Sequence, residues 1–263
     1  MIYSPYDWNE AIGHRKEYIE TRLREGSPVI AISYQDGVLM VTIRRAQRKV
    51  FEIYDRIMFS GIGNQADIET LRISSIDFAH QEGFNRSPDD VSVHRLVGFS
   101  LSPPLKKAFG DQFTAPFVVR AIFAEMGRRK EEDSLYVLNY DGEFTEATSF
   151  AVVGGTLNAE DQMALSLIGV NSDIERDQAI SRAFKAWSTG VLAVRKSGSQ
   201  DHEESEIVNT ENDEELNRVL EQELKTGVVE AAVLERSTLR ESKFRHLTEK
   251  ELEPILSAYR SGT

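Results

Sequence analysis

The stretch Glu25–Val41, EGSPVIAISYQDGVLMV, decides how the chain folds. Two runs rich in apolar and β-branched residues, at 28–34 and 38–43, flank the pair Asp36-Gly37. An Asp-Gly pair between two such runs is a strong hairpin signal, because glycine accepts the positive φ that a tight turn requires. The stretch therefore predicts an antiparallel β-hairpin near the start of the chain.

A helix is expected before this hairpin. Asp7 followed by Glu10 has the spacing of a capping box, which marks a helix start. Apolar residues then recur at helical spacing, and Gly26 can end the helix.

The rest of the chain predicts an α+β fold. Strands are predicted at 49–53, 57–60, 117–125, 135–140, 150–153, 228–234 and 243–246. Helices are predicted at 64–82, from 87 to beyond 101, at 158–170, at 173–194 and from the capping box Thr248–Glu251. Because strands come in hairpin-like groups and helices in pairs, the order differs from a parallel α/β alternation. It predicts two antiparallel sheets packed face to face, with helices on both outer faces.

The second of the predicted helices after the hairpin contains an obstacle. Pro103-Pro104 falls inside it. Proline lacks the N–H that an inner helical turn needs and clashes with the preceding turn. We therefore expect the helix to break or kink at this pair.

Composition excludes several functions. The 263 residues include no cysteine, which excludes disulfides, thiolate metal sites and a cysteine nucleophile and fits a cytoplasmic protein. The formal net charge of −12 argues against a nucleic-acid partner bound through a general basic surface. No apolar run approaches about 18 residues and the start lacks a signal-peptide pattern, so we expect no membrane partner.

Most of the negative charge lies in one segment. Residues 201–223 hold ten acidic residues and one basic residue, Arg218. So many like charges must be solvated, because they cannot be buried unpaired. We expect an acidic surface insertion at about 197–226, as a flexible loop or a surface helix. A docking tail for a basic partner is the alternative.

No motif in the chain predicts a cofactor or a metal. Residues 61–66 have the G-x-G-x-x-A spacing of a dinucleotide-binding turn, but two helices follow where a parallel strand should come. We interpret this motif as a tight strand-to-helix turn. Histidines lack the i, i+4 spacing of a helical metal site. They are scattered at His14, His80, His94, His202 and His246.

Several segments, taken in order, resemble proteasome subunits. The hairpin ending in DGVL is followed by KVFEIYDRIMFSGIGNQADIETLR at 49–72, then by AIFAEMG, LYVLNYDGEF and FAVVGGT. The segments VVEAAVLERS and FRHLTEKELEPIL resemble the closing strands and helix of the family. The resemblance covers most of the chain. It implies a four-layer αββα sandwich of the Ntn-hydrolase type, in agreement with the element order.

Within that family the chain resembles the non-catalytic α-type. Active β-type subunits use an N-terminal threonine as nucleophile and its free amine as base. Here the matching junction reads GSP at 26–28, and the family's catalytic acid falls near Ile43, which cannot serve. Lys49 matches the catalytic lysine, although α-type subunits also carry a lysine there. The leading helix and IYSP at 2–5 resemble bacterial α-type chains, so we expect no catalytic residue.

An α-type subunit implies an assembly. By resemblance, seven copies form a ring, and two such rings flank two rings of β-type subunits. Trp8, Ile12 and Ile19 form an apolar stripe that we expect to contact the β ring or neighbouring copies; packing on the chain's own sheet is the alternative. The residues before the helix would lie near the axial pore and gate substrate entry. They are Met1, Ile2, Tyr3, Ser4 and Pro5.

Lys49 is the strongest candidate for a binding residue. In the family the matching lysine lines a pocket between adjacent α subunits and binds the C-terminal carboxylate of a ring ATPase activator. A lysine ammonium suits a carboxylate, because charge-assisted hydrogen bonds are the stronger kind. Gly61-Ile62-Gly63 matches the family's pocket turn. An ordinary solvated lysine at a strand start is the alternative.

These expectations divide the chain into a gate segment with a capped helix at 1–26 and a sandwich domain at 27–263. Two other functions stay open. One is a catalytically active β-type or self-assembling peptidase with an atypical propeptide, whose mature chain would start near residue 27. The other is a non-proteasomal relative that forms rings or spirals.

Overall fold

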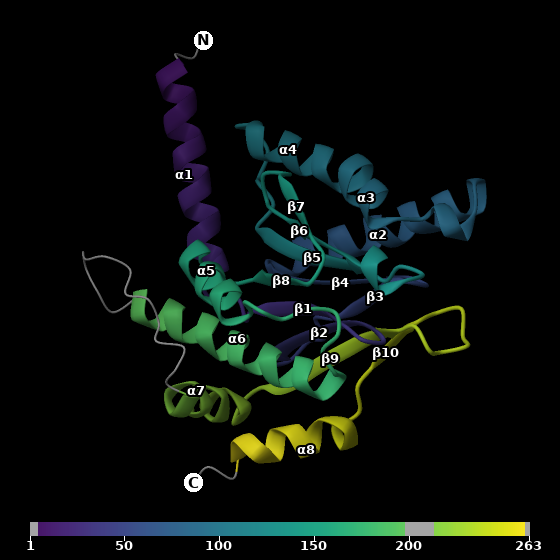
Figure 1. Cartoon of the computed structure of the whole chain (residues 1–263). Helices are drawn as coiled ribbons and strands as arrows, with labels where there is room; N and C mark the ends of the chain where they lie inside the picture. Colours follow the sequence, from purple (N-terminus) through teal and green to yellow (C-terminus); the bar gives the residue numbers. More distant parts are fainter. Residues whose placement is uncertain (1–4, 198–212, 261–263) are drawn as a thin grey trace.

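Two five-stranded antiparallel sheets lie face to face between two helical layers (Figure 1), which confirms the predicted αββα sandwich. The computed structural model describes residues 5–197 and 213–260. Apolar side chains fill three interfaces: one between the sheets, and one between each sheet and its helices. Such layering hides both faces of each sheet from water.

The predicted hairpin lies at the centre of one sheet. This sheet has the order β10-β9-β2-β1-β8. Its strands are β1 (Val29–Tyr34), β2 (Gly37–Arg44), β8 (Phe150–Val153), β9 (Val228–Glu235) and β10 (Phe244–His246). Gly37 has a φ of 147°, and a Cβ there would lie 1.9 Å from the carbonyl oxygen of Leu234. Only glycine therefore fits between the turn and β9.

Strand β1 is buried on both faces. Val29 and Ala31 face the core between the sheets, whereas Ile30 and Ile32 face the helices. All four side chains have no exposed surface. Burial on both sides explains why this strand is almost continuously apolar in sequence.

The second sheet runs in the order β3-β4-β5-β6-β7. Its strands are β3 (Phe51–Tyr54), β4 (Ile57–Gly63), β5 (Val119–Glu125), β6 (Ser134–Leu138) and β7 (Phe144–Ala147). Strand β7 was not predicted from the sequence, where the segment after β6 was expected to turn directly into β8. Its residues FTEA are partly or fully exposed on an edge, so they carry no buried alternating pattern.

The second sheet is covered by helices that stay continuous through the proline pair. The layer holds α2 (Gln65–Asn85), η1 (Pro88–Asp90), α3 (Val93–Arg95), η2 (Leu96–Leu101) and α4 (Ser102–Gly110); a short η3 (Lys130–Glu132) follows β5. The break expected at Pro103-Pro104 does not occur, but the helix changes its hydrogen bonding there: the π-helical turn η2 ends at Leu101, the N–H of Ser102 donates to the carbonyl of Val97, and the two prolines lie in the first turn of α4. Proline has no N–H to donate to the preceding turn, and the π-helical turn accommodates this loss without interrupting the helical path.

The first sheet is covered by a second layer of helices. They are α5 (Leu157–Ser166), α6 (Arg176–Ser197), α7 (Asp213–Leu224) and α8 (Glu249–Arg260). Helix α7 carries the second half of the acidic segment and buries Leu216, Val219 and Leu220 in the core. Lys185 donates to Asp213 at 2.7 Å, so α6 supplies a counter-charge. Residues 198–212 of the predicted insertion lie outside the described residues.

Helix α1 (Pro5–Leu23) starts two residues before the predicted cap Asp7, with proline at its first position. Ile19 has no exposed surface, because it packs in the core between the sheets. The predicted ring contact through Ile19 is therefore wrong, and the alternative packing on the chain's own sheets holds for this residue. Ile12 is half-buried. The side chain of Trp8 lies outside the described residues, and the domain division at residue 26 stays a prediction.

None of the helices in the described ranges combines the length and the apolar character that crossing a membrane requires.

Candidate functional site

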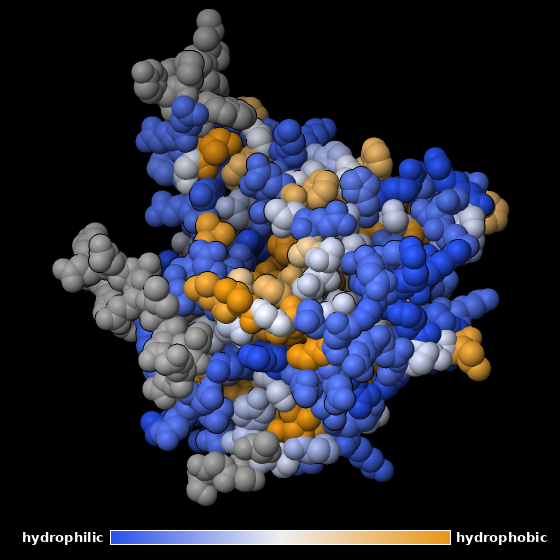
Figure 2. Space-filling model, viewed as in Figure 1, coloured by the Kyte–Doolittle hydropathy of each residue, from blue (hydrophilic) through white to orange (hydrophobic). Residues whose placement is uncertain are grey.

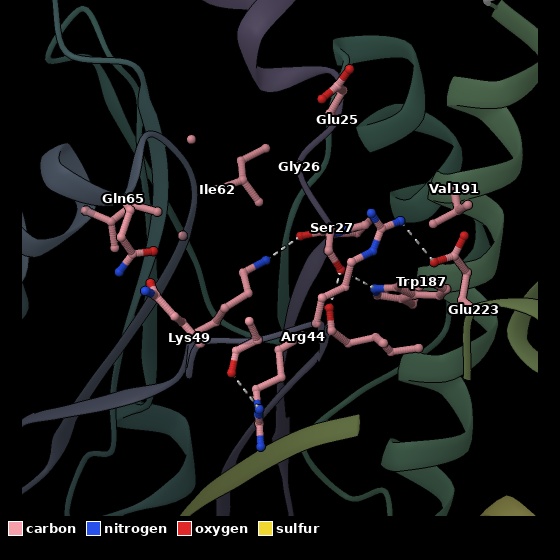
Figure 3. Close-up of a pocket in the computed structure, with 18 of the residues that line it drawn as sticks. Glu25, Gly26, Ser27, Arg44, Lys49, Ile62, Gln65, Trp187, Val191 and Glu223 are labelled. Atoms are coloured by element: carbon pink, nitrogen blue, oxygen red, sulfur yellow. Dashed lines mark hydrogen bonds and ion pairs between the residues drawn. The ribbon is translucent and has the colours of Figure 1, made fainter. Parts of the chain in front are cut away.

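A cavity of about 520 Å³ lies at the end of the sandwich where β1 begins (Figure 3). It is lined by the segment 24–28 before β1, by residues 43–49 from the end of β2 and the β2–β3 loop, by the end of β4 and the start of α2, by helix α6, and by Glu223 of α7. The predicted residues Lys49, Gly61, Ile62 and Gly63 all line this one cavity. Their role in binding an activator stays a prediction.

Glu230 fixes the position of Lys49. This glutamate lies on β9 and is only 5% exposed. Its carboxylate accepts from the backbone N–H of Lys49 at 2.9 Å and of Val50 at 3.2 Å. The end of the β2–β3 loop is therefore anchored to the neighbouring strand of the first sheet.

The Lys49 ammonium points into the cavity toward Ser27 (Figure 3). Its Nζ donates to the carbonyl oxygen of Ser27 at 2.7 Å and, at 3.4 Å, to the Thr42 hydroxyl. Burial lowers the pKa of Lys49 to about 8, although the nearby Glu230 carboxylate acts in the opposite direction. A lysine has three N–H donors, so the amine retains the capacity to bind an anion in the cavity.

The hydroxyl of Ser27 is engaged within the chain. Its Oγ donates to the carbonyl oxygen of Ile43 at 2.6 Å and accepts from Nε1 of Trp187 at 3.3 Å. The sequence placed the family's catalytic acid near Ile43, and at this position the structure offers Ser27 a backbone carbonyl and an apolar side chain instead of a carboxylate. A nucleophile needs an adjacent base, and Ser27 makes its hydrogen bonds to a carbonyl and an indole instead.

The predicted pocket turn is the end of a strand. Gly61, Ile62 and Gly63 pair with β5 to the end of β4, and α2 begins after the single capping residue Asn64. The motif is therefore a tight strand-to-helix connection, as predicted, with its three residues still in the strand. Gly63 has a φ of 129°, and a Cβ there would lie 2.0 Å from the carbonyl oxygen of Val118. Ile62 is buried in the core between the sheets. These residues form a close-packed, apolar side of the cavity.

Positive charge gathers around the cavity, although the chain as a whole is acidic. Two acidic residues, Glu25 and Glu223, are among those that line it. The basic residues are more numerous: Arg24, Arg44, Arg45, Arg48, Lys49 and Arg195. A concave site with this excess of cations attracts anionic groups.

Several residues of the site were not singled out from the sequence. Glu230 is an isolated carboxylate in the apolar strand VVEAAV, a signal that could have marked it for a specific partner. The run RRAQRK at 44–49 places four cations in six positions and could have marked the basic loop. Trp187 belongs to the apolar face of α6, and nothing in its local sequence separates it from other core residues.

The predicted gate residues are not placed. Met1, Ile2, Tyr3 and Ser4 lie outside the described residues, and only the backbone of Pro5, as the start of α1, is described. Within the described residues, no group of three histidine, aspartate or glutamate side chains is arranged to hold a metal ion.

Residues 23–200 match a family described as "Proteasome subunit". The chain belongs to the proteasome subunit family. It is 32% identical to the proteasome subunit alpha of Actinosynnema mirum over 247 residues, which cover 92% of this chain and 82% of that protein. The proteasome subunit alpha of Gordonia bronchialis is 31% identical over 250 residues, covering 92% and 84%. That of Streptomyces avermitilis is 29% identical over 256 residues, covering 97% and 90%.

These likenesses confirm the resemblance to bacterial α-type proteasome subunits. They extend over nearly the whole chain, beyond the family match at 23–200, and so include α1 and the closing strands.

Proposed function

We propose that this proteasome subunit is a non-catalytic member of the core particle. In this proposal it forms the outer, heptameric ring on β-type subunits in the cytoplasm, gates substrate entry and docks the C-terminal tail of a ring ATPase activator. One observation carries the docking: the half-buried Lys49 ammonium faces a cavity of about 520 Å³ with donor capacity to spare. A terminal carboxylate is the partner that such an ammonium binds through charge-assisted hydrogen bonds.

The surroundings of Ser27 support a non-catalytic role. Its hydroxyl is committed to Ile43 and Trp187, and its carbonyl to Lys49. Pro28 follows and is buried. In this arrangement the lysine holds a backbone carbonyl, so it is not positioned to activate a nucleophile.

Both helical layers offer surface for ring contacts. Figure 2 shows apolar side chains gathered on the face that carries α5. In and just after this helix Leu157, Leu165 and Ile168 are at least half exposed. In the opposite layer Phe84 and Phe99 are also mostly exposed. A closed ring needs two different complementary faces on each copy. We propose that these exposed side chains, and not Ile19, contact the neighbouring subunits. The start of α1 projects beyond the sheets (Figure 1), so in this proposal it can also make contacts near the pore.

A substitution at Lys49 tests the docking. We expect Lys49→Ala to abolish activator-stimulated protein degradation by particles assembled with the β-type subunit, while the particles themselves still form on a sizing column. Lys107→Ala is the matched control, because Lys107 is an exposed lysine on α4, far along the chain from the cavity lining. Unchanged stimulation in Lys49→Ala would contradict the docking site.

The intact mass of the chain purified from such particles tests the non-catalytic role. We expect no cleavage at the junction before Ser27. A mature chain that starts near residue 27, together with peptide hydrolysis by this chain alone, would favour the β-type peptidase instead.

A further inference from the structure

We propose that the Lys49 cavity selects partner tails that carry acidic residues just before their terminal carboxylate. This inference rests on the proposed docking function and adds a chemical requirement to it. The terminal carboxylate would reach Lys49, and the preceding acidic side chains would lie among the arginines at the opening. We call these arginines, Arg24, Arg45 and Arg48, the basic rim.

The basic rim lies outward from Lys49. Arg24, Arg45 and Arg48 are exposed, whereas Lys49 is half-buried and bound to the carbonyl of Ser27. The rim comes from two separate parts of the chain: Arg24 directly follows α1, and Arg45 and Arg48 lie in the β2–β3 loop. A peptide whose last carboxylate reaches Lys49 must therefore pass cations on its way out.

Among residues 5–197 and 213–260, few acidic groups compensate the charge of the rim. Glu223 is shared by Arg195 at 2.6 Å and Arg45 at 3.8 Å, so its stronger pair is with Arg195. Within the ranges that the structure describes, Arg24 and Arg48 form no ion pair. Counted over the part of the chain that the structure describes, the rim keeps a net positive charge that an acidic segment can complement.

Apolar walls decide what kind of anion fits. Val191 and Val194 of α6 are partly exposed in the lining and supply its accessible apolar surface, whereas Ile62 and Trp187 are 1% exposed and pack behind it. A cavity with apolar walls, one inner ammonium and an outer ring of guanidinium groups suits a peptide end that has an apolar residue near its carboxylate and acidic residues further back. A small inorganic anion would leave the apolar walls unused.

The expected gain is modest and depends on salt. Exposed ion pairs are individually weak, and salt screens them over about 10 Å at 0.1 M ionic strength. Two acidic residues on the rim should together tighten binding about three- to tenfold at low salt. Complementary charge should act mainly by raising the association rate.

Fluorescence anisotropy on particles assembled with the β-type subunit tests the inference with three labelled octapeptides. All end in tyrosine and leucine; the two residues before this pair are glutamates, serines or lysines, and the remaining residues are glycine and serine. Each peptide is made with a free C-terminal carboxylate and with a C-terminal amide. We expect the glutamate peptide to bind about three- to tenfold more tightly than the serine peptide at 50 mM NaCl, the lysine peptide most weakly, and these differences to shrink at 300 mM.

A double substitution locates the effect. Arg45→Gln with Arg48→Gln should remove most of the advantage of the glutamate peptide over the serine peptide, both measured on the same variant. Arg128→Gln with Arg129→Gln is the matched control, because these adjacent arginines are 71% and 76% exposed and do not line the cavity. The control should keep the full advantage.

The peptide set separates the two proposals. Equal affinities of the glutamate and serine peptides, or an advantage that survives the double substitution, would overturn the acidic selectivity alone. If the carboxylate and amide forms of the serine peptide bind equally, or if no peptide binds, the docking function itself fails and the selectivity with it.

Discussion

A charged side chain lies near each end of strand β1, and the two differ in how many hydrogen-bond partners they have within the chain. At the far end, Asp133 is 1% exposed and has a full set of partners. It accepts from the Ser33 hydroxyl at 2.8 Å, from the N–H of Gly127 at 2.9 Å and from the Arg236 guanidinium at 2.9 Å. At the near end, the Lys49 ammonium has a carbonyl and a distant hydroxyl, and it faces a cavity.

Burial opposes the charged form at both ends. It raises the pKa of Asp133, while Ser33 and Arg236 act to lower it, and it lowers the pKa of Lys49 to about 8. The difference lies in how the remaining hydrogen-bonding capacity is used. The Asp133 end links the two sheets through internal bonds, whereas the Lys49 end leaves donor capacity for a partner. In the proposed function, the Asp133 end contributes stability and the Lys49 end binds a partner.

The largest effect is expected from removing the counter-charge of Asp133. Arg236→Ala leaves Asp133 buried with its main counter-charge removed, which should lower the free energy of unfolding by about 3–5 kcal/mol. Urea unfolding followed by circular dichroism measures this loss. Arg129→Ala is the control, because its pair with Glu132 is exposed and worth about 0–1 kcal/mol. Equal losses in the two variants would contradict the stabilising role of the Asp133 network.

The next largest effect is expected on the pH dependence of peptide binding at Lys49. Only the protonated form of Lys49 attracts a carboxylate, and its pKa lies at about 8. Affinity for the serine carboxylate peptide should therefore fall as pH rises above 8, by up to about tenfold per pH unit. Anisotropy titrations between pH 7 and 10 measure it.

A variant that stays charged provides the control for this pH dependence. Lys49→Arg should bind with an affinity that does not change over the same range, because arginine remains protonated. A wild-type affinity that is equally constant would show that the Lys49 charge does not take part in binding.

The smallest effect is expected on the stability of the fold when Lys49 loses its charge. Lys49→Met loses the hydrogen bond to the Ser27 carbonyl, worth about 1 kcal/mol, and the longer one to the Thr42 hydroxyl, and also removes the cost of a desolvated ammonium. The free energy of unfolding should therefore change by no more than about 1 kcal/mol in either direction, in the same urea experiment. A loss above about 2 kcal/mol would place Lys49 with Asp133 among the stabilising charges.

Local signals predicted most of the fold. The Asp36-Gly37 pair fixed the hairpin, and the capping box at Thr248 correctly marked the last helix: the Glu251 carboxylate accepts from the Thr248 N–H at 2.9 Å. Edge strand β7 escaped prediction because it is exposed and polar. The π-helical turn before Pro103 escaped because no local pattern distinguishes it from an ordinary helix.

The site was predicted only in part, for a related reason. Lys49 and Gly61–Gly63 were found by resemblance and do come together around one cavity. Glu230 and Trp187 lie more than 100 residues further along the chain and approach only through tertiary packing. The helical stripe of α1 predicted an apolar face correctly at Ile19, but periodicity alone cannot say whether such a face meets the same chain or another.

The edge strands of both sheets are short, which affects how copies of the chain can associate. Strands β3, β7 and β8 have four residues each and β10 has three, whereas the inner strands have five to eight. A short border offers few free backbone groups to a strand of another molecule. Subunits held side by side at high local concentration are thereby protected from merging their sheets, and helices and loops are left to determine how copies meet.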